Sequence, residues 1–154
     1  MNFEAIFYDF DGVMTDNTVQ ISQDGSEFVR VNRGDGLAIS EIKKLKIYQA
    51  IISTEKNPVV KARSEKLQIP CFQGVLNKLH EVNNICESKK INLKNSAFIG
   101  NDINDKEVME SIGLSVCPSD SNQTILSISD IILQSKGGDG VIREFYDYIL
   151  GEMR

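Results

Sequence analysis

The sequence is poor in the side chains that build transition-metal sites. It has one histidine, His80, and three cysteines, Cys71, Cys86 and Cys117, among 154 residues. One histidine cannot form a zinc site or a serine–histidine pair by itself, and the cysteines lack the close spacing of metal ligands. We therefore expect three buried thiols and a histidine with a structural or surface role.

Long apolar runs and an excess of positive charge are also missing. No apolar stretch approaches the roughly 20 residues that cross a membrane, and the first residues do not form a basic and apolar leader. The net charge of −5 gives no reason to expect a nucleic acid as partner. The expectation is a cytoplasmic protein that binds neither membranes nor nucleic acids.

Short apolar strands alternate with helical patterns along the chain. Helices separate six predicted strands, at residues 4–9, 47–53, 70–72, 96–100, 114–117 and 130–133. This alternation predicts an α/β fold of three layers, a Rossmann-like parallel sheet covered by helices on both faces. We expect one domain over residues 1–154.

Two glycine-containing segments interrupt the pattern. Residues 17–33 alternate on either side of Gln23-Asp24-Gly25, which predicts a β-hairpin with a glycine turn. Residues 137–140, Gly-Gly-Asp-Gly, resemble a phosphate loop but lack its Gly-Lys-Ser/Thr ending. We interpret them as a loop that leads into the last helix.

The most informative residues follow the first strand. Side chains two apart on an extended backbone point the same way, so Asp9 and Asp11 crowd together at its end. Two unpaired carboxylates repel each other and lose hydration, a cost that a cation or a proton on one of them relieves. Gly12 lets the backbone turn away. A plain acidic turn would explain these residues alone, and a calcium loop is disfavoured because Val13 interrupts it.

Further polar residues follow later strands. Ser53 ends the second predicted strand, and Gly100, Asn101 and Asp102 follow the fourth. In open parallel sheets the ligand lies beyond the carboxyl ends of the strands. We therefore expect these residues to share one site with the carboxylates of the first strand.

The order of these motifs resembles that of the haloacid dehalogenase superfamily. Residues 9–15 are similar to its first motif, the strand ending in Ser53 to the second, and residues 99–105 to the acidic fourth, while Lys78 stands at the lysine of the third. Larger members carry a cap domain where this chain has only the hairpin. The resemblance implies a capless fold, with a site that is open unless another subunit covers it.

The resemblance also implies a magnesium-dependent phosphatase with an aspartyl-phosphate intermediate. Asp9 would attack phosphorus, and Asp11, its pKa raised by burial and by the nearby carboxylate, would protonate the leaving oxygen and then activate water. Ser53 would donate a hydrogen bond to a phosphoryl oxygen. Lys78 would supply positive charge and keep Asp9 ionised. Magnesium would bind Asp9, the Asp11 backbone carbonyl and a side chain of the fourth motif.

The fourth motif departs from the usual pattern, because Asn101 stands at its first acidic position. An amide oxygen can bind magnesium but removes one negative charge. The third metal ligand is therefore either Asn101 or Asp102. Asp105 is expected to orient a metal-bound water or to pair with Lys78.

The hairpin, residues 33–37 and residues 137–144 resemble the capless branch that includes octulosonate 8-phosphate phosphatases. Where those enzymes have Gly-Arg, this chain has Thr54 and Glu55, which is similar to phosphatases of nine-carbon keto sugar acids. The implied substrate is 2-keto-3-deoxynononate 9-phosphate or N-acetylneuraminate 9-phosphate, with the eight-carbon ester as the alternative. A homotetramer with sites near subunit interfaces is also implied. The expected substrate contacts are Thr54, Glu55, Lys66 and Arg143.

Two other classes of protein are alternatives. A phosphatase-like module could keep the fold only to oligomerise, although the joint presence of Asp9, Asp11, Ser53 and Lys78 argues against it. A phospho-accepting receiver domain has a similar sheet and an acidic pocket. Receivers carry the accepting aspartate at the end of a later strand, and this chain has Ser53 at the end of its second strand.

Overall fold

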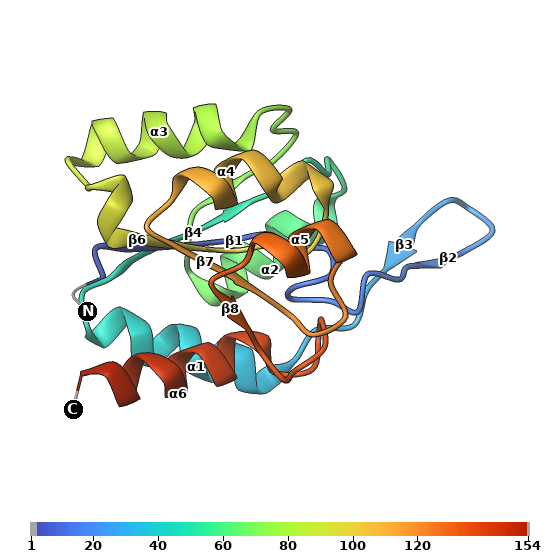
Figure 1. The fold of residues 1–154 in the computed structure, drawn as a ribbon. Helices are drawn as coiled ribbons and strands as arrows, with labels where there is room; N and C mark the ends of the chain where they lie inside the picture. The colour runs from blue at the N-terminus through green and yellow to red at the C-terminus, as the bar shows by residue number, and fades with distance from the viewer. Residues whose placement is uncertain (1–2, 154) are drawn as a thin grey trace.

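The computed structural model describes residues 3–153, and a six-stranded parallel sheet forms its centre (Figure 1). The strand order is β5–β4–β1–β6–β7–β8, and every neighbouring pair is parallel. Each strand overlaps the range that the sequence predicts for it. The strands are β1 (Ala5–Tyr8), β4 (Tyr48–Ile52), β5 (Cys71–Phe72), β6 (Ser96–Ile99), β7 (Leu114–Cys117) and β8 (Ile131–Ile132).

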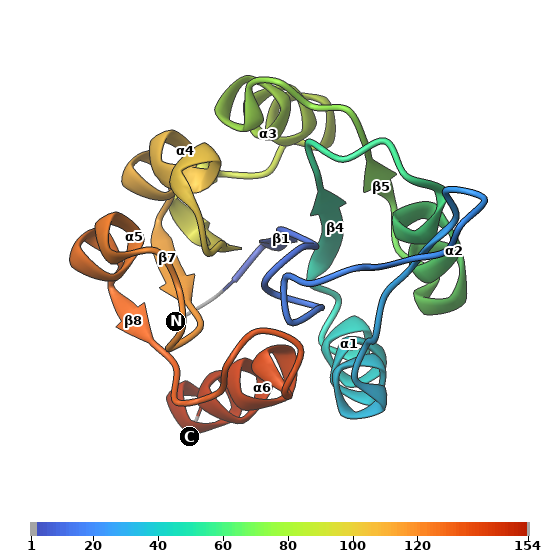
Figure 2. The same ribbon diagram turned by 90° about the vertical axis from the view of Figure 1, so that its right-hand side faces the viewer.

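Helices cover both faces of this sheet (Figure 2). Successive residues of β1 point to opposite faces, so Ile6 and Tyr8 join one apolar core, while Ala5 and Phe7 join the other. This confirms the predicted three-layer α/β fold. The first core is closed by α1 (Arg33–Lys44), α2 (Pro58–Leu67) and α6 (Val141–Glu152), and the second by α3 (Lys78–Lys89), α4 (Lys106–Ser111) and α5 (Gln123–Ile128).

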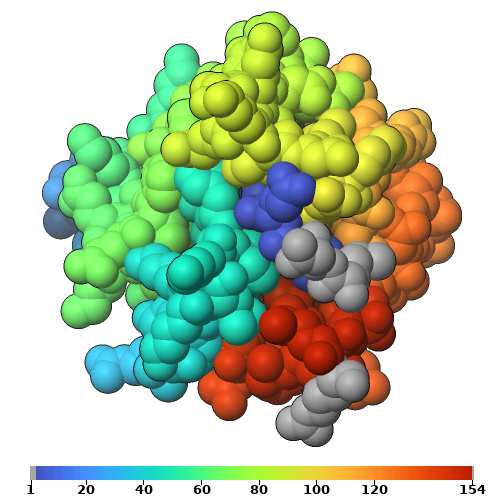
Figure 3. Space-filling view, turned by 90° about the vertical axis from the view of Figure 1, so that its left-hand side faces the viewer, coloured from blue at the N-terminus to red at the C-terminus, as the bar shows by residue number. Residues whose placement is uncertain are grey.

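The strands begin on one side of the molecule and end on the other. Figure 3 shows the side on which they begin, where the first described residues lie between the end of α1, the segment after α3, and α6. The strands end on the opposite side, from which the hairpin projects (Figure 1). Among residues 3–153, no helix combines the length and apolar character that crossing a membrane requires.

The inserted hairpin has the predicted position and turn. Its strands β2 (Gln20–Ile21) and β3 (Glu27–Phe28) pair antiparallel, and Gly25 in the turn has a φ of +85°. Such a backbone conformation favours glycine. The hairpin exposes three large apolar side chains, those of Val19, Ile21 and Phe28.

One expectation about burial is wrong. Cys71 is only partly buried because it lies on β5, an edge strand of the sheet. On α1, Ala38, Ile39 and Ile42 face the core, whereas Leu37 is 63% exposed. Cys86 and Cys117 are buried as predicted, and His80 is exposed.

A buried carboxylate joins α1 to α6. Asp35 Oδ1 accepts the N–H groups of Ile142 and Arg143 at 3.0 and 3.1 Å, and so caps α6, which begins after Gly140 and has no side-chain cap of its own. Burial raises the pKa of Asp35 to about 6, although these two N–H groups oppose the shift. Its Oδ2 atom is buried without a hydrogen-bond partner among the described residues. The ionised form is therefore costly here.

We expect the free energy of unfolding to depend on Asp35 between about pH 4 and pH 6. The folded state binds the proton of the Asp35 carboxyl group more tightly than the unfolded chain does. The free energy of unfolding of the wild type should therefore fall by up to about 3 kcal/mol as the pH rises through this range. Asp35→Asn keeps the acceptor without the charge and should lose correspondingly less. Urea unfolding from pH 4 to pH 7 measures this, with Asp147→Asn on the exposed face of α6 as control. Equal losses in wild type and Asp35→Asn would contradict the assignment.

Candidate active site

Acidic and amide side chains converge where three adjacent strands end. β1 leads into Asp9 and Asp11, β4 into Ser53, and β6 into Asn101. The chain leaves β1 towards β4 on one side and later adds β6 on the other, the type of position at which open α/β sheets bind ligands. A hollow of about 190 Å³ lies there, lined by Asp9, Asp11, Asn17, Thr54, Asn101, Asp102 and Asn104.

Lys78 is the buried cation of this site. Its Nζ lies 2.8 Å from Asp9 Oδ1 and 2.7 Å from Asp105 Oδ1, and its side chain is 1% exposed. Burial opposes the charge, but the two carboxylates prevail and raise the pKa of Lys78. Of the two roles expected for Asp105, the structure therefore shows the pairing with Lys78.

Asp9 lies almost fully buried between this lysine and the hollow. Its Oδ1 also accepts the N–H of Phe10 at 2.8 Å. Burial and the Asp105 charge raise the pKa of Asp9 to about 7, against the opposing effect of Lys78. Lys78 acts against this shift, but its charge is shared between Asp9 and Asp105. A second positive charge beside Asp9 would favour the carboxylate.

Three oxygen atoms face one another beside Asp9. The side-chain oxygen of Asn101 lies 3.0 Å from Asp9 Oδ2 and 2.9 Å from the backbone oxygen of Asp11. Turning the amide over would place its NH₂ group there and form two hydrogen bonds. A magnesium ion would instead use all three oxygens, because octahedral ligands at 2.0–2.1 Å lie about 2.9 Å from their neighbours. The oxygen set thus fits magnesium.

Asp102, the other candidate for the third ligand, is engaged elsewhere. Its Oδ1 accepts the N–H of Ile103 at 2.8 Å and caps the short helix η2 (Ile103–Asp105). No cluster of three or more His, Cys, Asp or Glu suited to a metal occurs within residues 3–153. A cation site here therefore depends on the Asn101 amide and on a backbone oxygen.

Asp11 lies at the mouth of the hollow and is partly buried. Burial raises the pKa of Asp11, and the charges of Glu55 and Glu27 raise it further, while Lys78 lowers it. Burial acts as predicted, but the carboxylates that raise the pKa of Asp11 are those of Glu55 and Glu27 and not that of Asp9. The Ser53 hydroxyl, 1% exposed, accepts the N–H of Glu55 at 3.1 Å, which leaves its own proton for another acceptor.

The glycine loop before α6 supports the loop after β1 from behind. Gly12 has a φ of +83°, and Asn101 occupies the space that a side chain at Gly12 would need. The N–H of Gly138 donates to the Val13 backbone oxygen at 3.0 Å, and a side chain at Gly137 would overlap the Gly12 backbone. Because the backbone N–H groups of Gly137 and Gly138 both have partners, the interpretation as a helix-leading loop is supported over a phosphate loop. Sequence reasoning missed this supporting role.

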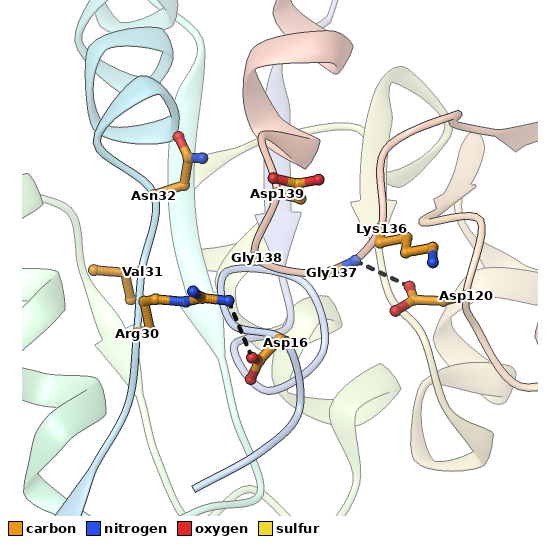
Figure 4. A pocket seen from close by; sticks show the side chains of 9 residues that line it. All are labelled: Asp16, Arg30, Val31, Asn32, Asp120, Lys136, Gly137, Gly138 and Asp139. Atoms are coloured by element: carbon orange, nitrogen blue, oxygen red, sulfur yellow. Dashed lines mark hydrogen bonds and ion pairs between the residues drawn. The ribbon is translucent and has the colours of Figure 1, made fainter. Parts of the chain in front are cut away.

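A larger hollow, of about 420 Å³, lies beside the same loop (Figure 4). Asp16 lines it, whereas the next residue, Asn17, lines the acidic hollow. Three of its charged side chains have partners: Arg30 lies 3.6 Å from Asp16, and Asp120 accepts the N–H of Gly137 at 2.9 Å. It contains none of the predicted catalytic residues, so the smaller, acidic hollow is the candidate site.

Three of the four predicted substrate contacts, those of Glu55, Lys66 and Arg143, are not among the residues that line the acidic hollow. Lys66 is eight residues beyond the start of α2, about 12 Å along its axis, and lines a separate groove with Arg63 and Leu37. Arg143 is exposed at the start of α6, where its Nε lies 3.7 Å from Asp147 Oδ1. Of the expected substrate contacts, only Thr54 lines the hollow.

Comparison with known proteins agrees with this geometry. A family model described as haloacid dehalogenase-like hydrolase matches residues 37–145. The 3-deoxy-D-manno-octulosonate 8-phosphate phosphatase of Escherichia coli (strain K12) is 33% identical over 150 residues, which cover 97% of this chain and 80% of that protein. N-acylneuraminate cytidylyltransferase A of Danio rerio is 33% identical over 143 residues, which cover 90% of this chain but 33% of that protein.

The fold comparison gives the same result. The crystal structure of 3-deoxy-D-manno-octulosonate 8-phosphate phosphatase from Moraxella catarrhalis, in complex with magnesium ion, phosphate ion and a KDO molecule, is similar with a TM-score of 0.94. The two chains are 26% identical, and the match covers 97% of this chain and 87% of that one. With the ordered motifs and the matched family model, this shows that the chain belongs to the haloacid dehalogenase-like hydrolase family and is a phosphoric monoester hydrolase.

Proposed function

We propose that this chain is a magnesium-dependent phosphatase that hydrolyses the 9-phosphate of a nine-carbon keto sugar acid. The observation that carries the phosphatase chemistry is the convergence of the Asp9 carboxylate, the Asp11 backbone oxygen and the Asn101 amide beside the ammonium group of Lys78. Magnesium, when bound by the oxygens of these three groups, would supply positive charge next to the phosphoryl group. A magnesium-bound relative of the same fold supports this assignment.

The two aspartates of the first motif divide the reaction between them. Asp9 Oδ1, held by Lys78 and by the Phe10 N–H, forms a bond to phosphorus while the bond to the sugar oxygen breaks. Asp11 gives its proton to that leaving oxygen. It then takes a proton from the water that attacks the aspartyl phosphate, which releases phosphate and regenerates Asp9. The raised pKa of Asp11 suits the first, protonated role.

The remaining site residues contact the phosphate and the sugar. Ser53 donates its free proton to a phosphoryl oxygen, and Thr54 lines the entrance next to Asn104. Glu55 cannot bind a carboxylate and accepts hydrogen bonds from hydroxyl or amide groups of the sugar. Together with the similarity to a cytidylyltransferase of N-acylneuraminate, Glu55 supports a nine-carbon substrate. The eight-carbon ester, named in the phosphatase relatives, is the alternative.

The assembly is part of the proposal. The exposed apolar side chains of Val19, Ile21 and Phe28 support packing of hairpins from several copies into a homotetramer. Lys66 and Arg143 lie outside the hollow of their own chain, so their contact with substrate requires a neighbouring copy. Gel filtration of the wild type should give the mass of a tetramer, and a shift towards monomers in Ile21→Ser is expected. A monomeric wild type would contradict this arrangement.

Hydrolysis of p-nitrophenyl phosphate should require magnesium and Asp9. Asp9→Asn removes the nucleophile and should lower kcat by at least about 10³-fold, with the fold retained by circular dichroism. Asn101→Asp adds a negative charge to the oxygen set and should lower the magnesium concentration for half-maximal activity by about tenfold. Full activity in Asp9→Asn, or in the wild type after exhaustive chelation, would contradict the mechanism.

The proposed substrate is tested by comparing the turnover of nine-carbon and eight-carbon sugar-acid phosphates. Values of kcat/KM for 2-keto-3-deoxynononate 9-phosphate and N-acetylneuraminate 9-phosphate should exceed that for 3-deoxy-octulosonate 8-phosphate by at least about tenfold, because Glu55 replaces a carboxylate-binding group. Glu55→Arg should shift the preference towards the eight-carbon ester. A clear preference of the wild type for that ester would reject the nine-carbon assignment and leave the phosphatase chemistry intact.

A further inference from the structure

The inserted hairpin is tied to the loop after β4 by one side-chain hydrogen bond. Asn57 Nδ2 donates to Glu27 Oε2 at 2.9 Å, in a partly buried position. Glu27 begins β3 of the hairpin, whereas Asn57 is the N-cap of α2, where its Oδ1 accepts the Val59 N–H at 3.0 Å. Both ends of the Asn57 amide are therefore engaged. The carboxylate of Glu27 is fixed to the helix that follows the second motif.

The same loop is held from the other side as well. Gln73 Nε2 donates to the backbone oxygens of Asn57 and Glu55 at 2.9 and 3.3 Å. The N–H of Gly74 donates to the Glu55 backbone oxygen at 3.1 Å, and the N–H of Glu55 donates to the Ser53 hydroxyl. Residues 53–57 are thus held in place by several hydrogen bonds, and the bond from Asn57 fixes the position of Glu27 relative to this loop.

Glu27 and Glu55 are both held at the loop after β4, whose residue Thr54 lines the acidic hollow. Glu55 follows Thr54 directly, and Glu27 is bonded to Asn57 of the same loop. The effect of both charges on Asp11 agrees with this placement. The nearest buried cation, Lys78, is paired with Asp9 and Asp105. The hairpin and the loop after β4 therefore each place one carboxyl group near the hollow that Asp11 lines.

We propose that Glu27 is a specificity-determining residue, which together with Glu55 forms an acidic wall beside the leaving group of the substrate. A carboxylate accepts hydrogen bonds from hydroxyl groups and repels another carboxylate. The wall admits substrates whose carbons next to the phosphate ester carry hydroxyl groups, and it disfavours those with a carboxylate a few atoms from the phosphate. This inference rests on the proposed phosphatase function. It places the acid group of the sugar at the end remote from the ester.

Two small phosphates of matched shape test the wall. Glycerol 3-phosphate and 3-phosphoglycerate have the same three-carbon chain but end in a hydroxymethyl group and a carboxylate. Their inhibition constants against p-nitrophenyl phosphate hydrolysis should favour glycerol 3-phosphate in the wild type. Glu27→Gln keeps an acceptor for Asn57 without the charge, and should reduce that preference by about threefold to fivefold. Added salt should reduce the wild-type preference in the same direction.

Two further variants separate the wall from general effects. Glu87→Gln, on the exposed face of α3, changes the net charge equally and should leave the preference as in the wild type. Asn57→Ser keeps a capping oxygen for α2 but loses the donor to Glu27, and should relax the preference at unchanged melting temperature. An unchanged preference in Glu27→Gln, or an equal change for both ligands, would overturn the role of Glu27. Absence of magnesium-dependent hydrolysis in the wild type would instead overturn the proposed function on which it rests.

Discussion

The buried carboxylates of Asp9 and Asp105 share the ammonium group of Lys78, and the rest of the site depends on the net negative charge of these three groups. Asp9, Asp105 and Lys78 sum to one negative charge when both acids are ionised, in surroundings where Asp105 and Lys78 are almost completely hidden from water. An isolated buried charge is unfavourable, so the cluster favours either a proton or a cation. A divalent ion would turn its net charge from −1 to +1 and so attract a phosphate dianion.

Asn101 is best understood from the same balance. An aspartate at this position would bind magnesium more strongly, but the loaded cluster would then carry no net charge. The amide contributes an oxygen without a charge, so it weakens the hold on the metal and leaves more positive potential for the phosphoryl group. The closeness of Gly12 to Asn101 shows that the backbone is shaped around this side chain. The amide therefore belongs to the architecture of the site.

The sequence indicated those features that follow from local geometry. Alternating strands and helices predicted the parallel sheet, and the rule that ligands lie beyond strand ends brought Asp9, Asp11 and Asn101 together correctly. The distance of Lys66 from the hollow of its own chain was not predicted, because a helix of ten residues carries its far end away from the ends of the strands, which closeness in sequence does not reveal. Glu27 was missed because a hydrogen bond between residues 30 apart brings the hairpin back to the second motif. The hydrophobic periodicity of the sequence predicts helices and strands, but it does not predict such a contact between distant side chains.

The hairpin is the element on which both the proposed selectivity and the proposed assembly depend. Its paired strands have two residues each, too few for a hairpin to be stable alone in water, so its position depends on other contacts. Within the chain these include the bond from Asn57 to Glu27, and the ion pair between Arg30 and Asp16 is too exposed to add much. Burying the apolar side chains of the hairpin against other copies would add the missing stability. Because Glu27 belongs to the same hairpin, any contact that fixes the hairpin also fixes Glu27, so the proposed selectivity would be physically coupled to the proposed association of the chains.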